Sequence, residues 1–99
     1  MSSGEPLREH REVLEIRNEK GLHARAAVLL VEIAERFKSG AEVTVMKDGQ
    51  TVNGRSIMGI LTLGAEQGSH IEVVATGPQA PEAVAAIRAL VEARFNEEK

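Results

Sequence analysis

The sequence contains no cysteine. Disulfide bonds, thiol chemistry and cysteine-based metal sites are therefore excluded. Histidine is also scarce, and its three copies at positions 10, 23 and 70 are too far apart in the sequence to favour a metal site. The only aromatic side chains are Phe37 and Phe95, too few for the stacking platforms that bind nucleic-acid bases. We therefore expect neither a metal nor any other cofactor.

Long apolar runs are missing as well. No stretch approaches the roughly 18 apolar residues of a membrane-spanning helix, and the chain does not open with the pattern of a signal peptide. The formal net charge of −3 argues against a general nucleic-acid binder, which would need a basic face. With 99 residues, of which 42% are hydrophobic, the chain can form one core unaided by metals or disulfides. We expect a cytoplasmic monomer whose partners include neither nucleic acid nor membrane.

The hydrophobic patterning predicts seven elements in the order βαββαβα. Residues 1–10 are polar and contain glycine and proline, so we expect a flexible tail there and a single domain over residues 11–99. Alternation predicts strands at 12–16, 42–47, 50–53 and 69–76. Helical periodicity predicts helices at 24–38, at 55–63 and from Pro81 onward. This order indicates an α+β domain, with an antiparallel or mixed sheet and its helices on one face.

Particular residues support these assignments. Asp48-Gly49 is a strong signal for a two-residue hairpin turn, since both central residues of a type I′ turn need positive φ. Ser56 is a good N-cap for the short helix. His10 falls in the expected tail, and His70 falls on the more exposed face of its strand. Two apolar stripes predict the buried sides of the long helices: Ala26, Leu30, Ile33, Ala34 and Phe37 in the first, and Val84, Ile87, Val91 and Phe95 in the last.

The segment "GLHAR" (21–25) places His23 and Arg25 where the first long helix begins. Taken alone, both are compatible with ordinary surface residues. A helix N-terminus, however, has free N–H groups and about half a positive charge, and it therefore favours a phosphate. Arginine is a planar charged donor for phosphate oxygens, and a neutral histidine nitrogen is a nucleophile. The functional hypothesis is that His23 is a covalent phosphate acceptor.

More apolar residues occur near this segment than one small core needs. Val28 and Leu29 lie one turn beyond His23, Val28 nearly opposite the buried Leu30 and Leu29 at the flank of the buried stripe. The short helix carries Ile57, Met58, Ile60 and Leu61, and a helix of one or two turns cannot bury all four against one sheet. A docking surface for a partner explains the surplus; loose packing of the core is the alternative.

The segments "GLHARAA" (21–27) and "VNGRSIMGILTLGAEQG" (52–68) resemble the two signature segments of the HPr family, the histidine-containing phosphocarriers of the bacterial phosphoenolpyruvate-dependent phosphotransferase system. The likeness covers roughly residues 12–95. It implies an open-faced β-sandwich, with a four-stranded antiparallel sheet and three helices on one face. It also implies a relay protein rather than an enzyme with its own turnover.

The resemblance assigns roles to individual residues. His23 would accept the phosphoryl group at Nδ1 from phospho-enzyme I and pass it to an enzyme IIA domain, with Arg25 assisting. Ser56 matches the regulatory serine of some members, which would add an HPr kinase/phosphorylase as a partner. The partner-docking residues would be Val28, Leu29, Ile57, Met58 and Leu61, while Ile60 would belong to the core.

Three features depart from the family's usual pattern. Ala26 replaces the proline of G-L-H-A-R-P-A, the connection 38–42 is slightly longer, and the N-terminal tail is extra. They suggest a regulatory branch of the phosphotransferase system as an alternative to sugar uptake. A regulatory HPr-like module that binds a kinase or transcription factor is the other candidate function. An ordinary metabolic enzyme is disfavoured by the lack of paired carboxylates, a nucleotide-binding glycine loop or a plausible triad.

Overall fold

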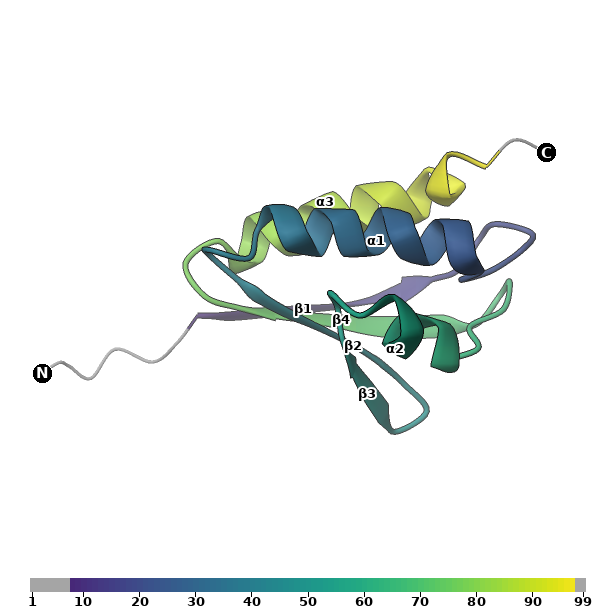
Figure 1. The fold of residues 1–99 in the computed structure, drawn as a ribbon, viewed down its shortest axis with the longest axis horizontal. Coiled ribbons are helices and arrows are strands. Elements are labelled where there is room, and N and C mark those ends of the chain that lie inside the picture. Colours follow the sequence, from purple (N-terminus) through teal and green to yellow (C-terminus); the bar gives the residue numbers. More distant parts are fainter. Residues whose placement is uncertain (1–7, 98–99) are drawn as a thin grey trace, which may run out of the picture.

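The computed structural model describes residues 8–97, which form one four-stranded antiparallel sheet with three α-helices on one face (Figure 1). The spatial order of the strands is β1-β4-β2-β3. The fold class and the βαββαβα order predicted from the sequence are confirmed. The elements are β1 (Glu9–Glu15), α1 (Ala24–Arg36), β2 (Glu42–Lys47), β3 (Gln50–Asn53), α2 (Ile57–Thr62), β4 (His70–Thr76), α3 (Ala80–Glu92) and a short 3-10 turn, η1 (Arg94–Asn96).

Alternation along the strands decides which side of the sheet the helices cover. In β4, Ile71, Val73 and Ala75 are buried, as their spacing predicts. The pairs Leu14–Ile71 and Val45–Val73 continue this apolar face across the register. The helices close the core with Leu30 and Ile33 of α1, Ile60 of α2, and Val84, Ile87 and Val91 of α3, all of which are buried.

The opposite face of the sheet carries charged side chains. Arg11 of β1 forms ion pairs with Glu9 on its own strand and with Glu72 on β4. The hydrogen bond to Glu9 and the second one to Glu72 raise the pKa of the Arg11 guanidinium above its ordinary value. Because a guanidinium is protonated at any physiological pH, the shift changes no charge. These ion pairs are exposed to solvent, and their side chains lie outside the core cluster.

Most element boundaries agree with the sequence-based prediction to within two residues, and two differ by more. β1 begins three residues earlier than predicted, so Glu9 and His10 belong to the sheet rather than to the tail, and His10 pairs with Ala75. Residues 1–7 of the predicted tail lie outside the described residues. The predicted stripe of the last helix ran through Phe95, but α3 ends at Glu92. Phe95 is buried all the same, because a left-handed turn carries it back onto the core.

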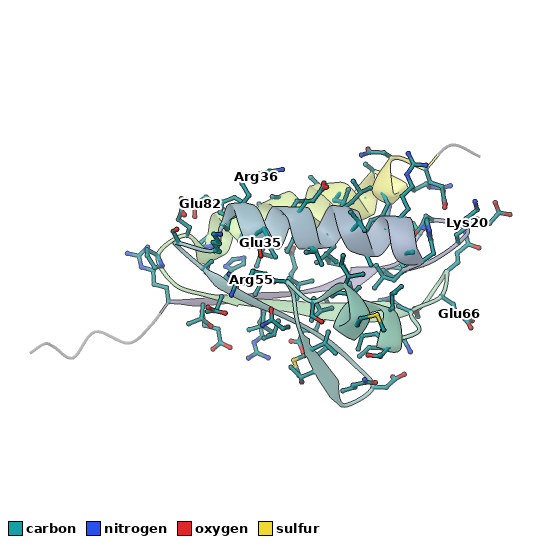
Figure 2. The ribbon with its side chains drawn as sticks, viewed as in Figure 1. Lys20, Glu35, Arg36, Arg55, Glu66 and Glu82 are labelled. Carbon is teal, nitrogen blue, oxygen red and sulfur yellow. The ribbon has the colours of Figure 1, made fainter. Side chains whose placement is uncertain are left out.

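The start of α1, the end of α3 and the loops that follow β1 and α2 meet at one end of the molecule (Figure 1). Figure 2 shows Lys20 and Glu66 at this end, while Arg36 and Glu82 mark the other. The Asp48-Gly49 turn joins β2 and β3 with φ of 52° and 82°, which confirms the hairpin. No helix within residues 8–97 is long and apolar enough to cross a membrane.

Candidate functional site

The loop between β1 and α1 is fixed by backbone hydrogen bonds to the loop that follows α2. The N–H of Leu22 donates to the carbonyl of Ala65 at 2.9 Å. Asn18 is fully buried, and its Nδ2 donates to the carbonyl of Gly21 at 2.8 Å. Gly21 adopts φ +67°, and a Cβ built there would lie 2.4 Å from the Ala65 oxygen. The loop therefore needs glycine for both its conformation and its close approach.

This loop delivers His23 to the N-cap position of α1. Its backbone is extended (φ −80°, ψ −178°), and its side chain makes no capping hydrogen bond. The first helical hydrogen bond runs from the Ala27 N–H to the His23 carbonyl at 2.8 Å. The N–H groups of residues 24–26 consequently have no helical acceptor, and no acidic side chain lies in the first turn. The imidazole is available for chemistry beside a helix end that attracts anions.

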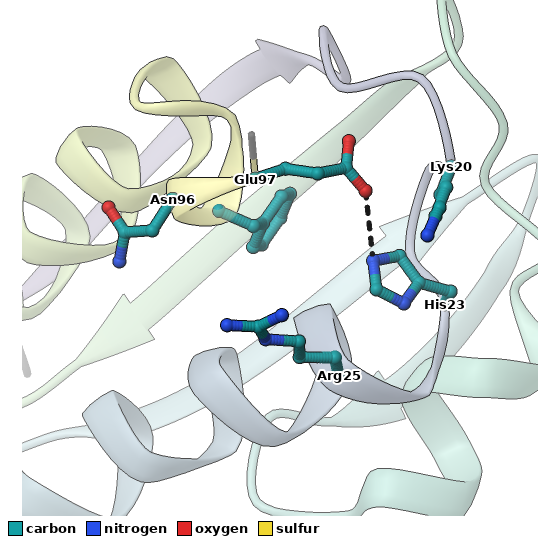
Figure 3. A pocket seen from close by; sticks show the side chains of 6 residues that line it. Lys20, His23, Arg25, Asn96 and Glu97 are labelled. Carbon is teal, nitrogen blue, oxygen red and sulfur yellow. Dashed lines mark ion pairs between the residues drawn. The ribbon is translucent and has the colours of Figure 1, made fainter. Parts of the chain in front are cut away.

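A pocket of about 300 Å³ opens at this helix end (Figure 3). The structure brings His23 and Arg25 together in its wall, as the sequence predicts. Lys20 adds a second permanent positive charge, and Glu97 contributes one carboxylate. Two cationic side chains and the positive end of α1 outweigh that carboxylate, so the pocket suits a small anion even though the whole chain is acidic. Phe95 and Asn96 complete the lining.

Glu97 reaches the pocket because of the turn after α3. Arg94, Phe95 and Asn96 adopt φ of 57°, 54° and 58°, a left-handed conformation that is uncommon for residues other than glycine. Burial of Phe95, which is only 2% exposed, opposes the conformational cost of this turn. The turn places the Glu97 Oε2 atom 3.3 Å from His23 Nε2.

Sequence reasoning missed Lys20, Asn96 and Glu97. Lys20 could have been predicted from the sequence, since it immediately precedes the "GLHAR" segment and carries the positive charge that a phosphate site needs. Asn96 and Glu97 could not be predicted, because the turn after α3 brings them to the site and the hydrophobic spacing of the last helix does not indicate that turn. Within the described residues, no cluster of three histidine, cysteine or acidic side chains could hold a metal.

The apolar surplus divides into exposed and half-buried residues. Met58 is 71% exposed, and Val28 and Ile57 are each 38% exposed. Leu29 and Leu61 are half-buried and pack against the core. The buried Ile60 confirms its predicted place in the core. Because α1 and α2 pack against each other, the exposed apolar side chains come from adjacent helices.

The remaining candidates lie apart from the pocket. Ser56 is the N-cap of α2, as predicted, and its Oγ accepts a hydrogen bond from the Gly59 N–H at 2.9 Å. His10 and His70 are exposed on β1 and β4, and neither lines the pocket. Of the three histidines, only His23 combines a helix N-terminus with cationic neighbours.

The sequence of this chain is similar to those of known phosphocarrier proteins. The family model of the PTS-HPr phosphorylation site matches residues 10–93. A phosphocarrier protein HPr of Treponema pallidum is 41% identical over 81 residues, covering 82% of this chain and 90% of that protein. The phosphocarrier protein NPr of Escherichia coli K12 is 40% identical over 89 residues, covering 89% of this chain and 97% of that protein.

The fold agrees with the same family. The crystal structure of HPr-C-His from Thermoanaerobacter tengcongensis superposes with a TM-score of 0.84 at 41% identity, covering 91% of this chain and 99% of that one. Sequence likeness and fold likeness thus extend over nearly the whole chain, including the segment that carries His23. This chain belongs to the HPr family of phosphocarrier proteins of the phosphotransferase system.

Proposed function

We propose that the chain accepts a phosphoryl group on Nδ1 of His23 from phospho-enzyme I and passes it to an enzyme IIA domain. The observation that carries the proposal is the N-cap position of His23, whose side chain makes no capping bond and faces a cationic pocket. In the first transfer, the Nδ1 lone pair forms a bond to phosphorus while the bond from phosphorus to enzyme I breaks. In the second, a nucleophile of the enzyme IIA domain bonds to phosphorus while the bond from phosphorus to Nδ1 breaks and returns the lone pair to the ring. The chain is an intermediate in the relay and performs no turnover of its own.

Each neighbour of His23 has a defined task in this proposal. The free N–H groups of the first turn of α1 bind phosphoryl oxygens, and the helix dipole stabilises their charge. The guanidinium of Arg25 contributes planar donors to the same oxygens. Positioned donors and charges of this kind stabilise the transferring group more than they stabilise the separated reactants.

The exposed apolar side chains Val28, Ile57 and Met58 form the docking surface for enzyme I and enzyme IIA, with Leu29 and Leu61 supporting it from below. Large apolar side chains exposed on adjacent helices are typical of an interface with a partner. A partner bound to this surface would cover the N-terminal end of α1 and exclude water from the phosphoryl group. The same surface explains how one carrier can serve two partners in succession.

Incubation with phosphoenolpyruvate and enzyme I tests the acceptor. We expect one phosphoryl group per chain, measured by intact mass, and its loss in His23→Ala. His10→Ala and His70→Ala are the matched controls, since both histidines are exposed and lie outside the pocket, and both variants should be labelled like the wild type. Labelling that persists in His23→Ala contradicts the assignment, and no labelling of the wild type at all supports the regulatory binding module instead.

We propose in addition that Ser56 is a regulatory phosphorylation site for an HPr kinase/phosphorylase. A phosphate on Ser56 adds about −1.5 to −2 charge at the start of α2, next to the exposed Ile57 and Met58. Ser56→Asp keeps an N-cap acceptor for the Gly59 N–H, so the fold should be retained while phosphorylation of His23 by enzyme I becomes slower. Ser39→Asp, an exposed serine beyond the other end of α1, is the control. Equal rates for Ser56→Asp and Ser39→Asp would refute the inhibitory role.

A further inference from the structure

We propose that Glu97 is a positioning residue for His23: its carboxylate holds the imidazole proton on Nε2, so that Nδ1 carries the lone pair that attacks phosphorus. The inference rests on the proposed function of His23 as the phosphoryl acceptor. It assigns a role to a residue that lies 74 positions away in the sequence and belongs to neither signature segment.

Glu97 and His23 face each other at the wall of the pocket. The Glu97 Oε2 atom lies 3.3 Å from His23 Nε2, and the two side chains are 16% and 28% exposed. Oε2 is buried, and among residues 8–97 no group forms a hydrogen bond with it. A buried carboxylate oxygen without a donor is costly, and Nε2 is the group next to it that can supply a proton.

The proton on Nε2 decides which ring nitrogen can react. A neutral imidazole carries a single N–H, and its other nitrogen holds the lone pair. Which nitrogen is protonated follows from the hydrogen bond that the ring makes. Figure 3 shows the second ring nitrogen of His23 directed away from Glu97. A carboxylate beside Nε2 therefore selects the tautomer in which Nδ1 is the free nucleophile.

The same carboxylate stabilises the product of the transfer. When the Nδ1 lone pair bonds to phosphorus and the phosphorus–donor bond breaks, Nε2 keeps its proton and the ring becomes positively charged. The negative Glu97 lies beside that charge, in the arrangement by which a carboxylate stabilises an imidazolium in catalytic triads. Its repulsion of the phosphoryl group is offset by Lys20 and Arg25 in the same pocket.

Glu97→Gln tests the role of the carboxylate. The amide keeps the shape of the side chain, but it can either accept a hydrogen bond from a ring N–H or donate one to a ring nitrogen. The control is Glu92→Gln, which removes the same charge from an exposed position at the end of α3. The ratio of the Nε2–H to the Nδ1–H form of His23 is measured by ¹⁵N NMR of the histidine-labelled, unphosphorylated chain. We expect Glu97→Gln to lower this ratio about fivefold, which is the size of effect that a partly exposed ion pair produces. His10 and His70 serve as internal references that must not change.

The rate of phosphorylation by enzyme I is the second measurement. We expect Glu97→Gln to slow it by about fivefold, as for loss of one partly exposed ion pair, with Glu92→Gln unaffected and both circular dichroism spectra unchanged. An unchanged tautomer ratio overturns the proposal, whether or not the rate falls. Because the NMR measurement needs no enzyme I, it tests the role of Glu97 even where labelling of the wild type fails.

Discussion

Replacing Gly21 by alanine should destabilise the domain more than the same replacement at any other glycine with a similar φ. The matched reference is Gly64→Ala, since Gly64 follows α2 at φ +59° and Gly21 sits at φ +67°. A Cβ on Gly64 would meet no atom within 4 Å. A Cβ on Gly21 would lie 2.4 Å from the Ala65 oxygen, which is held in place as the acceptor of the Leu22 N–H.

The two substitutions share one cost and differ in a second. The left-handed conformation costs an alanine about 1–2 kcal/mol at either position. Alanine also lowers the conformational entropy of the unfolded chain, which stabilises both variants by about 0.4–1 kcal/mol. Only Gly21→Ala must also push a backbone carbonyl aside, an overpacking cost of about 1–3 kcal/mol. The difference between the two variants is therefore the energy of that single contact.

Thermal unfolding followed by circular dichroism measures this difference. For a domain of this size, about 1 kcal/mol lowers the midpoint by 4–8 °C. Gly21→Ala should consequently melt about 5–20 °C below Gly64→Ala. Urea unfolding provides the free energies on the same samples. Equal midpoints for the two variants would show that the two loops separate at little cost, and that the β1–α1 loop is not held as the structure describes.

Three further predictions concern the site. Arg25→Ala should slow transfer to His23 by about 10²–10³-fold, as for loss of one donor to a transferring group, with an unchanged unfolding midpoint because Arg25 is exposed; an unchanged rate excludes this role. Met58→Glu should weaken binding to enzyme I in calorimetry without altering the circular dichroism spectrum, whereas unfolding would assign Met58 to the core. Ala26→Pro should fold, melt at or above the wild-type temperature and retain phosphotransfer, because the Ala26 N–H has no helical acceptor. A midpoint several degrees lower would mean that the proline ring does not fit at this fully buried position.

Local patterns predicted most of the fold. The alternation in β4, the turn at Asp48-Gly49 and the N-cap at Ser56 each depend on neighbours within a few residues, and each is confirmed. The end of α3 could not be found in this way. Phe95 has the spacing of a buried helical residue and is buried, but the chain reaches that position through a left-handed turn.

The candidate site shows the same division. His23 and Arg25 were predicted because both lie in one segment at a helix start. Glu97 was not, since its place beside His23 depends on where α3 ends and on how the buried Phe95 redirects the chain. Contacts between segments far apart in the sequence leave no periodic signal in either segment, so a single sequence cannot reveal them.

The strand order β1-β4-β2-β3 has a consequence for synthesis on the ribosome. β2 and β3 can pair as soon as both are made, but β1 must wait for β4, which is complete about 60 residues later. At about 5–20 residues per second, that delay is roughly 3–12 s. During this interval the charged side chains of Glu9, Arg11 and Glu15 discourage β1 from pairing with other nascent chains. The loop that presents His23 is anchored only after the loop that follows α2 has been made, since that loop bonds to Ile16 and Leu22, so the proposed phosphoryl acceptor site forms late in synthesis.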